Sequence, residues 1–186
     1  AEDGIRDYKV TGVQTCALPI FPQNSDILTT ASANPSIFFY VSSPKATLGE
    51  VILLDKNNNE LYSAQFTLPN KQGITKVVLY PKQLLISGES YEYSLKIKCY
   101  SLNGNVYVAE TKGQLKYTKL DDKETVFLKD QDYLSRARFY ANHGYWLDTL
   151  DNAAHLNSQQ WRALLESAGL SSFSLIDCCT NVIIPK

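Results

Sequence analysis

The sequence predicts an α+β fold, in which an antiparallel β-sandwich is followed by a small C-terminal helical hairpin. Short apolar segments with a period of two, separated by turns, extend from Ile27 to about Leu120. After Leu120 the apolar residues recur with the period of an amphipathic helix. The chain also contains twelve Tyr and seven Phe among 186 residues, which suits half-buried sheet surfaces. These patterns indicate a sandwich over residues 21–120 and a helical appendage over residues 121–175.

The first twenty residues, AEDGIRDYKVTGVQTCALPI, differ in character from the rest of the chain. Residues 1–7 and 10–20 match the translation of a widely used sequencing-library adapter, and Tyr8-Lys9 stands at its variable index. We interpret residues 1–20 as an adapter-derived artefact that is not native, so the native N-terminus and any signal peptide are missing. We expect this segment to be poorly packed and Cys16 to be unpaired. Removing its three acidic and two basic residues changes the net charge from −1 to zero.

The sandwich is expected to contain about seven short strands, because turn residues interrupt the apolar segments about every 8 to 12 residues. An immunoglobulin-like arrangement fits this spacing best, although the Cys…Trp…Cys pattern of antibody domains is absent. The predicted strands are residues 36–41, 50–55, 60–68, 73–80, 89–101, 105–110 and 113–120.

Residues 121–175 are expected to form helices packed on the sandwich, and residues 176–186 a C-terminal tail. The first helix begins with Asp121 or Asp122 as its cap, and the last has Ser158 as its N-cap. Between them, one predicted helix ends at Gly144 and the next covers residues 145–156.

The short turn before Tyr145 predicts that the two middle helices form an antiparallel hairpin. This hairpin is similar to one tetratricopeptide-type unit, with a small residue at Ala137, aromatic residues at Tyr140 and Trp146, and the turn at Gly144. A single unit of this type cannot bury its own apolar face. We therefore expect it to pack on the sandwich or on a partner.

The composition disfavours two classes of partner. A neutral chain lacks the basic excess that binding to nucleic acid or to an anionic membrane surface requires. No apolar run approaches the roughly 20 residues of a membrane-spanning helix.

No catalytic motif, cofactor-binding loop or metal-binding motif is recognisable, so we predict no catalytic residue, cofactor or metal ion. His143 and His155 are 12 residues apart, and this spacing disfavours a metal site shared with Asp148 or Asp151. Ser90 lacks the second glycine of a nucleophile elbow and precedes a strand.

Three cysteines are candidates for disulfide bonds, with their partners left open. Cys99 lies on the apolar face of a predicted strand, where a buried thiol is the favoured interpretation. Cys178 and Cys179 are adjacent, and adjacent cysteines rarely bond to each other. One of them could pair with Cys99 or with a cysteine of the missing N-terminus.

Aromatic residues gather in the helical part of the chain. Most aromatic side chains are expected in the core or between the sandwich and the helices. A minority could form a groove for sugar or peptide, and the candidate interaction surface consists of Tyr140, Tyr145, Trp146 and Trp161.

Five blocks of sequence, in the same order, resemble a mostly cyanobacterial family, the domain of unknown function DUF928. The blocks are LTTASANPSIFFYV, YSAQFTLPNKQGITKVVLYP, YEYSLKIKC, RFYANHGYWLDTL and WRALLESAGL, and they span nearly all of residues 26–175. The resemblance implies an exported protein with an N-terminal signal and supplies no established activity. The family's Cys-containing stretch near its N-terminus is absent here, so a disulfide from it to Cys99 cannot be traced.

We predict a non-enzymatic binding or interaction module of the cell envelope, with a protein or small ligand as its partner. One alternative is a hydrolase or carbohydrate-active enzyme whose carboxylates converge only in three dimensions. A second alternative is an accessory or chaperone-like domain for secretion.

Overall fold

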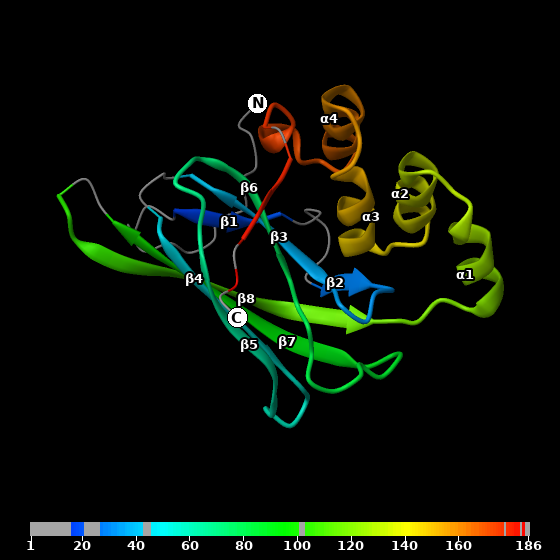
Figure 1. Ribbon diagram of the computed structural model, residues 1–186, viewed down its shortest axis with the longest axis horizontal. Coiled ribbons are helices and arrows are strands. Elements are labelled where there is room, and N and C mark those ends of the chain that lie inside the picture. The colour runs from blue at the N-terminus through cyan, green and yellow to red at the C-terminus, as the bar shows by residue number, and fades with distance from the viewer. Residues whose placement is uncertain are drawn as a thin grey trace.

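The computed structural model describes residues 16–20, 27–42, 46–100, 103–176, 178–182 and 184. It contains two β-sheets and four α-helices, and Figure 1 shows the helices grouped beside the β2 and β3 end of the sheets. Among the described residues no helix is long and apolar enough to span a membrane.

The five-stranded sheet has the order β2-β8-β7-β4-β5. Its strands are β2 (Ile27–Thr30), β4 (Leu48–Leu54), β5 (Glu60–Thr67), β7 (Ser90–Tyr100) and β8 (Val106–Tyr117). Strands β4, β5, β7 and β8 pair antiparallel, whereas β2 pairs parallel with β8. The alternating exposure along β7 shows that one face of this sheet is buried and the other meets solvent.

The four-stranded sheet has the order β1-β3-β6-β9. Its strands are β1 (Ala17–Pro19), β3 (Ser36–Val41), β6 (Gly73–Val78) and β9 (Thr180–Asn181). Strands β1 and β6 both pair antiparallel with β3, and β9 pairs parallel with β6. Residues 180–181 therefore form a strand at the edge of this sheet, where only a C-terminal tail was expected.

Two predictions about the strands need correction. The sheets are not wholly antiparallel, because β2 and β9 each add a parallel pair at a sheet edge. The predicted strands 105–110 and 113–120 are one continuous strand, since Thr111 and Lys112 pair with β7 without a break. Gly113, the first residue of the predicted strand 113–120, lies inside this strand opposite Tyr93.

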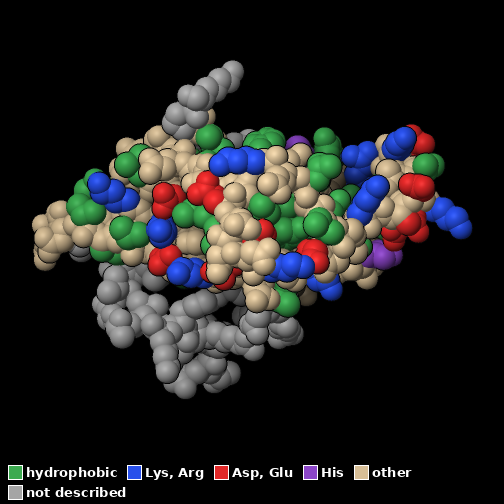
Figure 2. Space-filling view, turned by 90° about the horizontal axis from the view of Figure 1, so that it is seen from below, with side chains coloured by type: hydrophobic (Ala, Val, Ile, Leu, Met, Phe, Trp, Pro, Cys, Tyr) green, Lys and Arg blue, Asp and Glu red, His purple; other side chains and the backbone are tan. Residues whose placement is uncertain are grey.

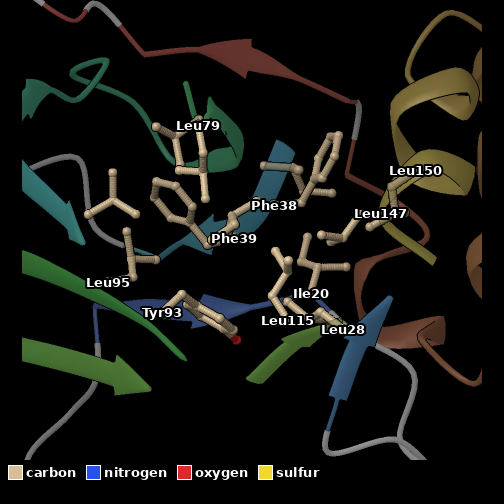
Figure 3. Packing of buried hydrophobic residues seen from close by; sticks show 14 of the residues in the cluster. Ile20, Leu28, Phe38, Phe39, Leu79, Tyr93, Leu95, Leu115, Leu147 and Leu150 are labelled. Atoms are coloured by element: carbon tan, nitrogen blue, oxygen red, sulfur yellow. The ribbon is translucent and has the colours of Figure 1, made fainter. Parts of the chain in front are cut away.

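Strand β3 is buried on both faces, which explains its uninterrupted apolar sequence. Phe39 packs toward the five-stranded sheet, with its ring centroid 6.2 Å from that of Phe66 on β5. On the other face, Ser36 contacts helix α3 through Asp151. Helix α3 packs on β2 of the five-stranded sheet and on β3 of the four-stranded sheet, and Figure 3 shows side chains from both sheets and from α3 in one core.

The helices are α1 (Asp122–Lys129), α2 (Tyr133–Asn142), α3 (Trp146–Ala153) and α4 (Ser158–Ser167), followed by the short 3-10 helix η1 (Ser171–Phe173). Asp121 caps α1 in a reciprocal capping box with Glu124. The N-cap of α4 is Asn157, one residue before the predicted Ser158, because the Asn157 carboxamide accepts the backbone N–H of Gln160. Helix α2 packs against α3, and α3 packs on β2 and β3.

The described part of the N-terminal segment, residues 16–20, is packed into the sandwich. Strand β1 pairs with β3, and the side chain of Ile20 is 1% exposed. Cys16 is bonded to Cys99 of β7. The expectations of poor packing and an unpaired Cys16 are therefore wrong for these residues. Residues 1–15 lie outside the described part, and the adapter origin of the segment stays a prediction.

Replacement of Gly113 by Ala should destabilise the protein by about 1–3 kcal/mol, because the new methyl group would overpack a closed site. A Cβ at this position would lie 2.7–2.8 Å from atoms of the Tyr93 ring. Urea denaturation measures the change, with Gln114→Ala at an exposed neighbour as the control. A Gly113→Ala variant as stable as the control would show that the ring moves aside without cost.

Replacement of Cys16 by Ser should lower the free energy of unfolding by about 4 kcal/mol, because its disulfide closes a long loop in the unfolded chain. The two cysteines are 83 residues apart in sequence. Denaturation without reductant, compared with the Cys178→Ser/Cys179→Ser double variant, measures the difference. Equal stability of the Cys16→Ser variant and the parent chain would contradict a structural role of this bond.

Candidate functional site

Helix α3 is attached to the sandwich by two carboxylates on one of its faces. Asp148 is 7% exposed and accepts the backbone N–H of Ala31 at 2.8 Å and a hydrogen bond from the Thr30 side chain. Asp151 accepts hydrogen bonds from the Ser36 hydroxyl at 3.0 Å and from Nζ of Lys76 at 2.6 Å. We call these six residues, Thr30, Ala31, Ser36, Lys76, Asp148 and Asp151, the α3 anchor.

The position of Asp148 and Asp151 follows from helical geometry. Residues three apart on a helix lie one turn apart on the same face, so both carboxylates point toward the same part of the sandwich. Asp148 also lies in the first turn of α3, where the helix dipole favours a negative charge. The N-cap of α3, Tyr145, directly follows Gly144, whose φ of 76° permits the sharp turn from α2.

Burial raises the pKa of Asp148 to about 6, and the nearby charge of Asp151 acts in the same direction. The hydrogen bonds from Ala31 and Thr30 oppose this shift because they favour the ionised carboxylate. The pKa of Tyr140 is also raised, first by burial and then by the charge of Asp148. Titratable groups with shifted pKa values thus gather on one side of α3.

These groups line a pocket of about 470 Å³ at the junction of the helices with the β2–β3 loop. We call it the junction pocket. Its lining residues are Ala31, Ser32, Leu120, Thr125, Leu128, Lys129, Tyr133, Arg136, Tyr140, Asp148, Asp151, Asn152 and His155.

Two features hold the outer wall of the junction pocket in place. Arg136 donates from Nε to the carbonyl of Leu128 at 3.0 Å and from Nη2 to the carbonyl of Lys129 at 2.9 Å. These bonds satisfy carbonyls at the C-terminus of α1 and place a positive charge there. The ring of Tyr133 stacks on His155 at a centroid distance of 4.2 Å. Arg136 therefore joins α1 to α2, and the stacked pair joins α2 to the end of α3.

The structure separates the four residues of the candidate interaction surface. Trp161 and Trp146 are buried, with 2% and 9% exposure, so neither belongs to an exposed surface. Their Nε1 atoms donate to the carbonyls of Ile176 and Ile20 at 2.9 and 3.4 Å. The helices alone cannot bury these two large rings. The rings are instead buried against other segments of the chain, and this packing attaches the helices to the rest of the fold. Tyr140 and Tyr145 are half-buried, and only Tyr140 lines the junction pocket.

The two histidines also differ in position. His155 lines the junction pocket together with Asp148 and Asp151, whereas the spacing argument concerned a metal site shared by both histidines with these carboxylates. His143 instead stacks on Phe139 at a centroid distance of 4.1 Å, and its Nδ1 lies 2.8 Å from the Phe139 carbonyl oxygen. Within the described ranges, no three His, Cys, Asp or Glu side chains are grouped closely enough to hold a metal ion.

Sequence reasoning did not identify Tyr133 or Arg136 as site residues. Arg136 stands in an amphipathic helix, where a charged residue usually indicates only a solvated face. Its partners are carbonyls of another helix, and no sequence motif marks such contacts. The one local signal for this contact in the sequence is that Arg136 stands on the helix that directly follows a short, capped helix.

The surface visible in Figure 2 carries acidic and basic side chains interspersed with apolar ones. Ion pairs such as Glu50–Lys96 at 3.4 Å and Glu110–Lys112 at 3.6 Å illustrate this mixture on the five-stranded sheet. This face therefore shows no uniform basic patch of the kind that binds nucleic acid.

Comparison with known proteins gives one family match. The family model described as Domain of Unknown Function (DUF928) matches residues 2–176. The matched range includes most of the segment that we interpret as adapter-derived. No curated protein sequence matches the chain.

Similarity to solved structures is weak. CopC from Methylosinus trichosporium OB3b has 12% identity and a TM-score of 0.37, covering 57% of this chain and 97% of CopC. The periplasmic chaperone SfaE has 7% identity and a TM-score of 0.32, covering 50% of this chain and 53% of SfaE. A chain of the CsuC–CsuE chaperone–tip adhesion subunit pre-assembly complex from Acinetobacter baumannii has 12% identity, a TM-score of 0.31 and coverages of 62% and 64%. These TM-scores are too low to support an argument about fold or function.

Replacement of Asp148 by Asn should remove one component of the pH dependence of stability. The pKa of Asp148 is raised from 3.8 to about 6 in the folded protein. The native state then binds this proton more tightly than the unfolded state, so the free energy of unfolding falls as pH rises from about 4 to about 6. The shift corresponds to about 3 kcal/mol. Asn is neutral throughout this range, so the variant should lack this decline.

Urea denaturation between pH 4 and pH 8 measures this effect as the difference between the parent chain and the variant. Asp130→Asn, at an exposed carboxylate after α1, serves as the control and should keep the decline of the parent chain. Parallel pH profiles for Asp148→Asn and the parent chain would show that Asp148 titrates normally.

Proposed function

The chain belongs to the DUF928 family, and we propose that it is a binding module of the cell envelope whose ligand occupies the junction pocket. The observation that carries this proposal is the convergence of polar side chains from α1, α2 and α3 on one open pocket beside the β2–β3 loop. Its volume of about 470 Å³ lies in the usual range for small-ligand sites. The family description assigns no activity.

The lining residues support a polar ligand without strong net charge. Lys129 and Arg136 contribute two positive charges, and Asp148 and Asp151 contribute two carboxylates. Tyr133 and His155 add a pair of stacked rings, and such faces suit flat or ring-shaped ligand groups. A small polyhydroxy molecule or a polar peptide segment has this chemistry. A peptide ligand would fit the accessory or chaperone-like alternative.

A disulfide bond outside the adapter-like segment supports an oxidising compartment. Cys178 and Cys179 are bonded to each other. Disulfides persist in the periplasm and outside the cell and are rare in the cytosol. This agrees with the export that the family resemblance implies. The proposal about the pocket does not depend on the origin of residues 1–20, because none of its lining residues lies in that segment.

A hydrolase or carbohydrate-active enzyme is the second candidate function, because two carboxylates line the same pocket beside aromatic rings. A carboxyl group with a pKa near 6 can act as a general acid close to neutral pH. However, Asp148 and Asp151 each accept hydrogen bonds from two groups of the sandwich. These contacts fit an anchoring role better than a catalytic one.

Substitution of Tyr133 and His155 by Ala should weaken ligand binding about tenfold, because the stacked pair forms part of the pocket wall. Both side chains are exposed, so the loss of their stacking should lower the free energy of unfolding by no more than about 1.5 kcal/mol and leave the fold intact. The parent chain and variant are incubated with a cell-envelope extract and a panel of saccharides. Bound molecules are identified by mass spectrometry, and affinity is measured by calorimetry.

The matched control is Tyr80→Ala, which removes an aromatic ring that is 58% exposed and lies outside the junction pocket. A ligand held by the parent chain and the control, but lost in the double variant, supports the proposal. Equal retention by all three proteins, or no retained ligand, contradicts it. Turnover of chromogenic glycosides that Asp148→Asn abolishes would favour the hydrolase instead.

A further inference from the structure

The adjacent residues Cys178 and Cys179 are bonded to each other between η1 and β9. The residues before this bond and the residues after it both make contacts with other parts of the fold. Upstream, the carbonyl of Ile176 accepts the indole N–H of Trp161 at 2.9 Å. Downstream, the N–H of Val182 donates to the carbonyl of Lys76 at 3.1 Å. The bonded pair therefore joins the helical layer to the edge of the four-stranded sheet.

The Cys178–Cys179 bond cannot stabilise the whole fold by closing a long loop. A disulfide stabilises mainly by closing a loop in the unfolded chain, and the effect grows with loop length. These cysteines are one residue apart, whereas Cys16 and Cys99 are 83 apart. The consequence of the Cys178–Cys179 bond must therefore be local.

The two disulfides also differ in their access to solvent. Cys16 and Cys99 are 2% and 0% exposed, whereas Cys178 and Cys179 are only partly buried. Thiol–disulfide exchange needs direct contact between an attacking thiolate and a disulfide sulfur. Cys178 and Cys179 lie at the margin of the core, so a reductant needs less opening of the structure to reach their sulfurs than to reach those of Cys16–Cys99.

Strand β9, which follows directly, has little backbone pairing of its own, and Val182 and Ile184 beyond it pack against the core. It contains two residues, and its register on β6 places Thr180 beside Thr75 and Asn181 beside Lys76. In the described part of the chain, the buried hydroxyl of Thr75 has no hydrogen-bond partner. A strand this short does not hold its position by pairing alone. The ring closed by the Cys178–Cys179 bond constrains the backbone directly before β9. This constraint can therefore determine whether β9 stays paired with β6.

We propose that Cys178–Cys179 is a thiol–disulfide exchange site for dithiol reductants, and that its oxidation state controls the docking of β9 on β6. A thiolate of the reductant attacks one sulfur, the S–S bond breaks, and a mixed disulfide forms. The second thiol of the reductant then displaces the protein sulfur. The protein gains two electrons and two protons as two thiols, and the reductant becomes a cyclic disulfide.

The test uses the full oxidised chain and dithiothreitol as the reductant. Alkylation followed by peptide mass spectrometry identifies which cysteines open at each concentration. Hydrogen exchange measures the protection of the peptide that contains Val182. Cys178–Cys179 should open at a lower dithiothreitol concentration than Cys16–Cys99, and the Val182 amide should then exchange at least tenfold faster. Peptides of β7 and β8 should keep their protection.

The Cys178→Ser/Cys179→Ser variant should show the fast exchange at Val182 without any reductant, and should not change on addition of low dithiothreitol. Earlier or simultaneous opening of Cys16–Cys99 would overturn the proposal. So would selective opening of Cys178–Cys179 that leaves the exchange at Val182 unchanged in the parent chain. The outcome is independent of ligand binding in the junction pocket.

Discussion

The attachment of α3 to the sandwich is the interaction on which the rest of the helical layer depends. Asp151 bonds to Ser36 and Lys76 on adjacent strands, and Asp148 bonds to the β2–β3 loop. Asp148 is buried, so the loss of a hydrogen-bond partner would leave its carboxylate unsatisfied at a substantial cost in stability. Helix α2 packs on α3, and Arg136 links α2 to the end of α1. This series of contacts begins at the α3 anchor and positions the three helices that line the junction pocket.

The large aromatic side chains of this protein serve mainly to hold its layers together. Trp146 and Trp161 are buried and use their indole N–H groups to bind backbone carbonyls of distant segments. Phe39 and Phe66 lie between the two sheets. The groups available to a ligand are therefore the polar side chains of the junction pocket and the partly exposed rings of Tyr133 and Tyr140.

Local sequence signals predicted most of the elements of this fold. The segment 36–41 is a strand with the predicted bounds, because an apolar run between turn residues has few alternatives. Asp121 is the N-cap of α1, since its side chain and that of Glu124 satisfy backbone N–H groups within one turn. The errors occur where a distant residue decides the outcome. Gly113 lies inside a strand because β8 pairs with β7 on both sides of it, and Thr180 joins a sheet through β6.

The sequence was sufficient for the family, for most of the strands and helices, and for the shift from sheet to helix after Leu120, because propensity, capping and periodicity act over a few residues. Tertiary structure alone decided which cysteines are bonded and which aromatic residues are buried. It also brought Arg136, Asp148 and His155 to one pocket. These outcomes depend on contacts between segments as many as 126 residues apart, as between Ile20 and Trp146, and no local pattern encodes such a distance.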